Sequence, residues 1–228
     1  MIIGEQKPLE EIKQLVADHD SILVLGCGTC VTVCFTGGEK EVGVLASSLR
    51  IATKIDGNPK VINEATVQRQ CEWEFLDAVR DQVEKHDLIL SLACGIGVQA
   101  IAERFPQARA APAVNTTFLG LPEEVGLWTE RCAACGDCLL DQTAGICPIA
   151  RCAKSLLNGP CGGSQGGKCE IDPEVPCAWQ LIYDRLAAQG RLEQLLEITP
   201  AKDWSRSRDG GPRRLVREEL RLESHDNE

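Results

Sequence analysis

Two spacings of apolar residues alternate along the first half of the chain. Helical spacing marks residues 8–18, 39–50, 67–83 and 98–105. Short apolar runs of strand character lie between them, at residues 21–26, 50–55, 87–97 and 110–120. Helices and strands that alternate in this way form βαβ units. Residues 1–126 are therefore predicted to be an α/β domain, with a small, Rossmann-like, mostly parallel sheet.

The pattern changes after residue 126. Residues 127–200 hold eight cysteines, many glycines and few apolar runs until helical spacing returns at 177–189 and 191–198. Such a segment has too little apolar material to order itself, so its order is expected to come from something that the cysteines bind. Residues 201–228 read as a charged tail, either docked on a partner or solvated.

Composition narrows the chemistry. The 228 residues carry a formal charge of -10, which argues against nucleic acid as a partner and favours a protein. No apolar run is long enough for a membrane span and no leader segment is apparent, so a cytoplasmic protein is expected. Thirteen cysteines are an odd number, and a reducing compartment disfavours disulfides. Metal or redox chemistry is the expected use of these thiols.

The later cysteines show iron–sulfur spacing. Cys132, Cys135 and Cys138 form a C-x-x-C-x-x-C run, and Pro148 follows Cys147, as in bacterial ferredoxins. The full later set is Cys132, Cys135, Cys138, Cys147, Cys152, Cys161, Cys169 and Cys177. Eight thiolates suffice for two [4Fe–4S] clusters, one holding the run plus a remote cysteine and the other holding Cys147 plus three later ones. Zinc is the alternative, although two separate C-x₂₋₄-C knuckles are missing.

Five cysteines remain in the first half: Cys27, Cys30, Cys34, Cys71 and Cys94. The loop "GCGTC" also resembles a dinucleotide-binding turn, but Val31 stands where the third glycine would be. Parallel strands end at one crevice, so Cys27 and Cys94 are expected to emerge together. The sequence predicts a four-cysteine metal site drawn from these five, with the fifth left out. No hydrolase or kinase motif is present.

Several strings together resemble a known family. They are "GCGTCVTVCFTGGEKEV", "RQCEWEFLD", "SLACGIGVQA" and "RCAACGDCLLDQTAGICPIARCAKSLLNGPCGGSQGGKCEIDPEVPCAWQLIYDRL". They are similar to the methylenetetrahydrofolate reductase C-terminal domain family, in its free-standing form as an iron–sulfur subunit. The resemblance covers nearly the whole chain and places all thirteen cysteines among the family's metal ligands.

The resemblance implies a function in electron transfer. The partner would be a TIM-barrel catalytic subunit that holds FMN and reduces 5,10-methylenetetrahydrofolate to 5-methyltetrahydrofolate in the Wood–Ljungdahl pathway. This chain would carry two or three [4Fe–4S] clusters, with zinc at one site as an option, and would pass electrons to or from that flavin and further redox subunits. It would contribute no catalytic residue. The alternative is a zinc-stabilised scaffold or regulatory subunit of the same complex that transfers no electrons.

Overall fold

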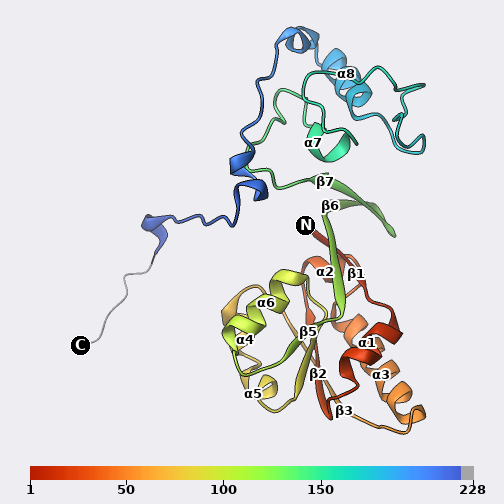
Figure 1. The fold of residues 1–228 in the computed structure, drawn as a ribbon, viewed down its shortest axis with the longest axis vertical. Coiled ribbons are helices and arrows are strands. Elements are labelled where there is room, and N and C mark those ends of the chain that lie inside the picture. The colour runs from red at the N-terminus through yellow and green to blue at the C-terminus, as the bar shows by residue number, and fades with distance from the viewer. Residues whose placement is uncertain (222–228) are drawn as a thin grey trace. The chain divides into compact units, whose positions relative to one another are not determined.

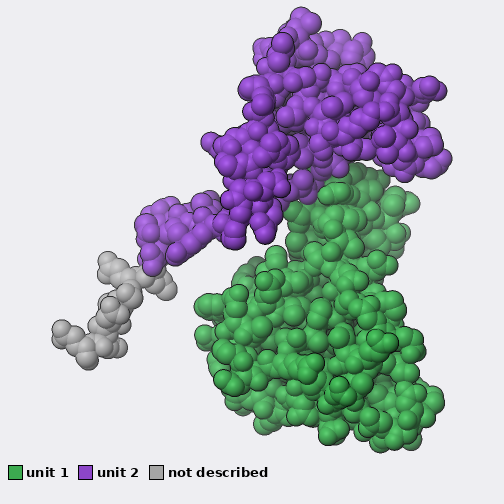
Figure 2. All heavy atoms as spheres, viewed as in Figure 1, with its two compact units in different colours: residues 1–131 green, residues 132–228 purple. Residues whose placement is uncertain are grey.

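The computed structural model describes residues 1–221 and divides the chain into two compact units, residues 1–131 and 132–228 (Figure 2). The strands of the first unit are β1 (Ile2–Gln6), β2 (Ser21–Cys27), β3 (Val61–Val67), β4 (Leu88–Ser91), β5 (Ala110–Pro112), β6 (Val114–Glu124) and β7 (Leu127–Cys132). Its helices are α1 (Leu9–Val16), α2 (Cys30–Val33), α3 (Glu39–Ile55), α4 (Trp73–Asp77), α5 (Arg80–Val83) and α6 (Gly95–Arg104) (Figure 1).

A four-stranded sheet forms the centre of the first unit, and its strands are all parallel in the order β3-β2-β4-β5. The chain moves from β2 to β3 on one side and then crosses to β4 on the other, so the switch in strand order lies beside β2. The predicted α/β fold with a parallel sheet is confirmed.

Successive residues of β2 supply both cores of the first unit. Ile22 and Val24 face a cluster that includes α1 and α3, and Leu23 and Leu25 face a second cluster with α4, α5 and α6. All four side chains are fully buried. Side chains alternate across a strand, so this continuous apolar run is what a sheet covered on both faces requires. Each such side chain contributes about 1.5–3 kcal/mol through burial.

A second sheet, not expected from the sequence, has the order β1-β6-β7. β1 pairs antiparallel with β6, which places Ile3 opposite Phe118. Two residues, Val125 and Gly126, connect β6 to β7, a connection short enough only for antiparallel strands. The N-terminal strand was missed because five residues at a chain end give little periodicity.

Two predicted elements of the first unit were wrong. Residues 50–55 do not form a strand but complete α3, because Leu49 and Thr53 continue its buried face while Ile55 is 78% exposed. The strand beside β2 is β3, which begins beyond the turn at Gly57. Residues 67–83 do not form one helix either. Val67 pairs with Cys27 at the end of β3, and the helical part is split into α4 and α5.

The second unit has few regular elements, as the sequence predicts. It contains α7 (Pro148–Arg151) and α8 (Ala178–Ala188), and the 3₁₀ helices η1 (Leu192–Leu196), η2 (Trp204–Arg206), η3 (Arg208–Gly210) and η4 (Glu218–Leu220). Its core is a small cluster around Ile146, Trp179, Ile182 and Leu186. Residues 191–198 were predicted to be a helix, and the structure has one 3₁₀ turn there. Within residues 1–221, no helix has the length and apolar character that a bilayer crossing requires.

Candidate functional site

Three cysteines of the first unit follow three adjacent parallel strands. Cys27 is the last residue of β2, Cys71 lies in the loop after β3, and Cys94 caps the N-terminus of α6 after β4. The carboxyl ends of these strands share one edge of the sheet, at the switch in strand order, where α/β proteins commonly bind ligands. The sheet topology therefore brings together three residues that are far apart in sequence.

The pKa of the Cys71 thiol reflects the proximity of Cys27 and Cys94. The pKa of its thiol is raised, first by burial of the sulfur and then by the neighbouring Cys27 and Cys94 thiols, whose charges would repel a thiolate. Cys71 thus lies near two further thiols at this edge of the sheet, and thiols are donors that suit soft metals.

Cys30 and Cys34 lie at the two ends of the short helix α2. Cys34 is 4% exposed, and its Sγ donates a hydrogen bond to the carbonyl oxygen of Ile2 at 3.5 Å. The pKa of the Cys34 thiol is raised chiefly by burial. Cys34 thus packs as a small apolar residue with a local partner. Cys27 is also buried, at 7% exposed, and its Sγ lies 3.9 Å from the Gln68 carbonyl oxygen.

The backbone of the "GCGTC" loop is already hydrogen-bonded within the protein. The Cys27 N–H donates to the carbonyl of Gly37 at 2.9 Å, and the Gly28 N–H donates to that of Val67 at 2.9 Å. A side chain on Gly26 would collide with Val42 and Thr66, so packing alone accounts for that glycine. Neither feature supports the nucleotide-binding alternative, which needs N–H groups directed at a phosphate.

Gln70 supports this edge of the sheet and was missed by the sequence reasoning. Its side chain is fully buried, and its Nε2 donates to the carbonyl oxygens of Leu25 at 2.8 Å and Gly26 at 3.0 Å. Its Oε1 accepts a hydrogen bond from Ser91 Oγ at 2.7 Å. Gln70 thus ties the ends of β2 and β4 together directly beside Cys71. A single polar residue in a loop gives no sequence signal for such a role.

Replacing Gln70 with leucine should destabilise the first unit by about 1–3 kcal/mol, because it leaves buried polar partners without a hydrogen bond. Urea denaturation of the full chain measures this loss. The Asn63 side chain also forms a side-chain hydrogen bond, with His86, but at the surface. Asn63→Leu is therefore the matched control and should change stability by less than about 0.5 kcal/mol. Equal effects of the two variants would contradict the structural role of Gln70.

Four later cysteines line one cavity in the second unit. Cys152, Cys161, Cys169 and Cys177 contribute to a cavity of about 20 Å³, together with Arg151, Lys154 and Glu170. They come from the end of α7, the glycine-rich loop and the start of α8. Cys147 does not line this cavity, so the grouping differs from the one that spacing suggested. Four thiols around one space form a donor set that suits zinc or an iron–sulfur cluster.

A charged pair lies beside this cavity. The Cys161 Sγ donates to Glu170 Oε2 at 3.4 Å, and Glu170 also forms an ion pair with Lys154. The pKa of Glu170 is lowered, by the Lys154 ammonium first and by the Cys161 thiol second. The carboxylate beside Cys161 is therefore charged at neutral pH and accepts a hydrogen bond from the thiol. A metal at this cavity would need Cys161 as a thiolate, since the thiolate is the ligand.

The remaining four cysteines belong to two other segments of the second unit. Cys132 is the last residue of β7, and Cys135 and Cys138 lie in the loop that follows, where the Ala134 N–H donates to Cys132 Sγ at 3.3 Å. The backbone of Ala134 is left-handed, with φ of 51°. Cys147 precedes α7 and accepts the Arg151 N–H at 3.0 Å through its carbonyl oxygen. An N–H group directed at a sulfur is the contact that tunes a thiolate-ligated metal.

The cysteine thiols are suitable metal ligands, but the side chains lie too far apart to bind a metal ion as they stand. All thirteen cysteines are free thiols. Within residues 1–221, however, no three His, Cys, Asp or Glu side chains lie close enough together to hold a metal ion as they stand. A cavity of about 20 Å³ has room for about one water molecule or one ion, so a [4Fe–4S] cluster would require the surrounding loops to open.

One comparison with known proteins gave a match. Residues 111–205 match the family described as methylene-tetrahydrofolate reductase C terminal. No curated protein and no solved structure matches the chain. The matched segment runs from β5 to η2 and contains every cysteine from Cys132 to Cys177. Residues 111–205 of this chain are therefore similar to the methylene-tetrahydrofolate reductase C-terminal family.

Proposed function

We propose that this chain is the electron-transfer iron–sulfur subunit of a methylenetetrahydrofolate reductase complex. The observation that carries the proposal is that the family match encloses all eight later cysteines, four of which line one cavity. A reductase that acts on a folate needs a source of electrons, and a cysteine-rich companion of its catalytic part suits that need. The partner would be a cytoplasmic FMN-containing subunit that converts 5,10-methylenetetrahydrofolate to 5-methyltetrahydrofolate.

The arrangement of thiols suggests how the sites divide. Cys152, Cys161, Cys169 and Cys177 would hold one centre, since they surround one cavity. Cys132, Cys135, Cys138 and Cys147 would form a second set. In the first unit, Cys27, Cys71 and Cys94 lie at one sheet edge, with Cys30 as the fourth thiol and Cys34 left out.

The residues of this chain would position and shield the bound groups. A [4Fe–4S] cluster supplies one-electron transfer, and a flavin can take or release electrons singly, so the two can be linked in series. Glu170, ion-paired with Lys154, would lie beside Cys161 at the edge of the bound group. Electron flow between the flavin and further redox subunits needs no contact between this chain and the folate.

Metal analysis of the chain purified without oxygen tests the proposal. We expect about four irons and four sulfides per cluster, hence about eight to twelve of each for two or three clusters. The preparation should be brown, and dithionite should reduce it to a paramagnetic state. Reduction of FMN in the separately purified catalytic subunit should then depend on this chain. A colourless protein that contains zinc and no iron would exclude electron transfer.

A zinc-stabilised scaffold is the second candidate, and the size of the cavity favours it. A cavity of about 20 Å³ has room for a single ion, so Cys152, Cys161, Cys169 and Cys177 would need smaller shifts of the loops to bind zinc than to enclose a cluster. This chain would then anchor or regulate the catalytic subunit without passing electrons. The same analysis separates the two proposals, because the scaffold predicts about one zinc per four-cysteine site and no acid-labile sulfide.

A further inference from the structure

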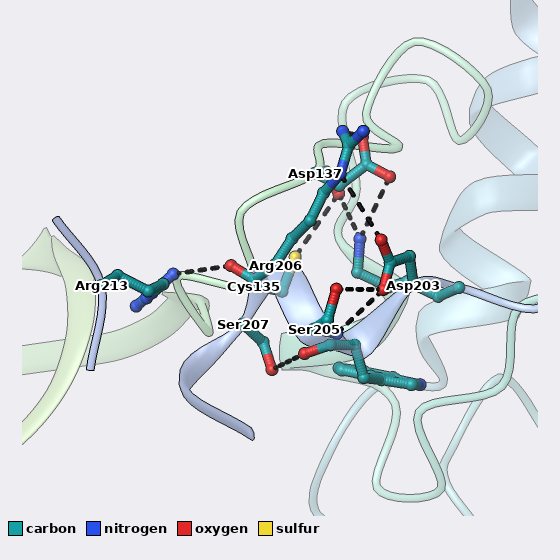
Figure 3. A network of polar contacts seen from close by, with 9 residues as sticks. Cys135, Asp137, Asp203, Ser205, Arg206, Ser207 and Arg213 are labelled. Atoms are coloured by element: carbon teal, nitrogen blue, oxygen red, sulfur yellow. Dashed lines mark hydrogen bonds and ion pairs between the residues drawn. The ribbon is translucent and has the colours of Figure 1, made fainter. Parts of the chain in front are cut away.

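The charged segment after residue 200 is folded against a cysteine loop of its own unit. Asp203 caps η2, since its Oδ1 accepts the Ser205 N–H at 3.0 Å. Ser207 caps η3, since its Oγ accepts the Asp209 N–H at 3.0 Å, and Ser207 is only 5% exposed. Two short turns, each with its own cap, give residues 202–213 a defined shape (Figure 3). We name this segment the clasp.

Cationic side chains of the clasp bind backbone carbonyls of the Cys132–Cys138 loop. Lys202 Nζ donates to the carbonyl oxygen of Asp137 at 2.7 Å and lies 3.6 Å from its carboxylate. The Lys202 side chain is only 1% exposed, although it is charged. Arg213 Nη1 donates to the carbonyl oxygen of Ala134 at 2.8 Å. A buried ammonium is costly unless it is paired, so Lys202 would not be held there without Asp137.

The backbones of the clasp and the loop also approach each other closely. Gly136 has φ of 83°, and a methyl group on it would overlap the carbonyl oxygen of Arg206. The same carbonyl oxygen accepts a hydrogen bond from Arg213 at 3.2 Å. Glycine is thus required at the middle of the loop both for its left-handed conformation and for space. The clasp therefore contacts Gly136 and hydrogen-bonds to the carbonyl oxygens of Ala134 and Asp137.

These contacts hold the loop without using the thiols as partners. The clasp donates to the carbonyls of Ala134 and Asp137, whereas the Cys132 sulfur accepts the Ala134 N–H and Cys135 Sγ donates to the Asp137 carbonyl at 3.5 Å. Fixing Ala134 and Asp137 fixes the backbone on both sides of Cys135. We propose that the clasp fixes the backbone around Cys135 and that its release controls how fast this half-buried thiol reacts and exchanges metal.

The clasp proposal depends on the proposed iron–sulfur function only for the identity of the bound metal. The clasp itself is tested with iodoacetamide on the full chain, purified without oxygen, by peptide mass spectrometry. Lys202→Ala with Arg213→Ala should raise the alkylation rate of Cys135 about tenfold, the factor expected when the net contribution of these bonds is lost. Cys132 and Cys138 are already exposed, so their rates should change less. The rate at Cys30 in the first unit should stay unchanged. Amide hydrogen exchange should rise in the same loop.

Three further variants make the result specific. Arg214→Ala removes a neighbouring exposed arginine for which residues 1–221 show no hydrogen bond or ion pair, so it should change nothing. Lys202→Arg with Arg213 intact keeps a cation and should restore slow alkylation. Gly136→Ala changes the loop and leaves the clasp sequence intact. It should loosen the same contact by pushing the Arg206 carbonyl away.

Equal alkylation and exchange rates in the original chain and the double variant would overturn the clasp. A chain that contains no iron but still shows loop-specific acceleration would refute the iron–sulfur assignment and leave the clasp standing. Acceleration at all thirteen cysteines would mean global unfolding and would also count against the proposal.

Discussion

Replacing Gly37 with alanine is expected to destabilise the first unit by about 3 kcal/mol or more. Gly37 lies between α2 and α3, and a methyl group on it would overlap the backbone carbonyl of Leu92, just beyond β4. Backbone cannot move aside as the end of a flexible side chain can. Either the loop before α3 or the end of β4 must shift, and both border the fully buried core.

The same substitution should disturb the cysteine edge of the sheet. The Gly37 carbonyl accepts the Cys27 N–H at 2.9 Å, and the Gly37 N–H donates to Val31 in the helix that carries Cys30. Urea denaturation of the full chain should show the stability loss. Amide exchange should accelerate at residues 27–34 before it does so at α1.

Gly43→Ala is the matched control. Gly43 lies within α3, and a methyl group there would meet only Glu64 Oε2 at 3.5 Å, an ordinary contact. Alanine in a helix interior should stabilise the unit by about 0.5–1 kcal/mol relative to glycine. The two Gly→Ala variants should therefore have opposite signs. A neutral Gly37→Ala would show that the approach to Leu92 is looser than described.

Replacing Cys177 with serine should remove the metal of one site and destabilise the second unit. Cys177 is 9% exposed, precedes α8, and belongs both to the four-cysteine cavity and to the small core. A serine hydroxyl is a poor ligand for the soft metals that thiolates hold. Since this core is small, metal binding there is also folding energy. We expect the loss of about four irons, or of about one zinc in the scaffold alternative.

Paired substitutions show which cysteines share a site. Cys161→Ser with Cys169→Ser should lose no more metal than either variant alone, because both line the same cavity. Cys161→Ser with Cys135→Ser should lose the metal of two sites. Cys34→Ser is the control for the packing effect of serine at a buried position, since its hydroxyl can still donate to Ile2. Full metal content in Cys177→Ser would contradict the assignment of this cavity.

The parallel sheet was predictable from local pattern, because a sheet that is buried on both faces needs continuous apolar strands such as β2. Other elements were not. Residues 50–55 are rich in β-branched side chains and looked like a strand, yet they continue the buried face of α3. The pairing of β1 with β6 joins residues more than 100 positions apart, and local spacing carries no information on such a partner.

The sequence by itself determined the donor chemistry: thirteen thiols, an iron–sulfur-like run and an α/β first half. Only the tertiary structure decided which thiols are neighbours. Strand order brings Cys27, Cys71 and Cys94 to one edge, and the packing of α8 against the glycine-rich loop surrounds one cavity with four later cysteines. It also showed that Lys202 and Arg213 of the charged C-terminal segment donate hydrogen bonds to the loop after Cys132. Residue type sets what a site can bind, whereas proximity depends on long-range pairing and packing that no local pattern records.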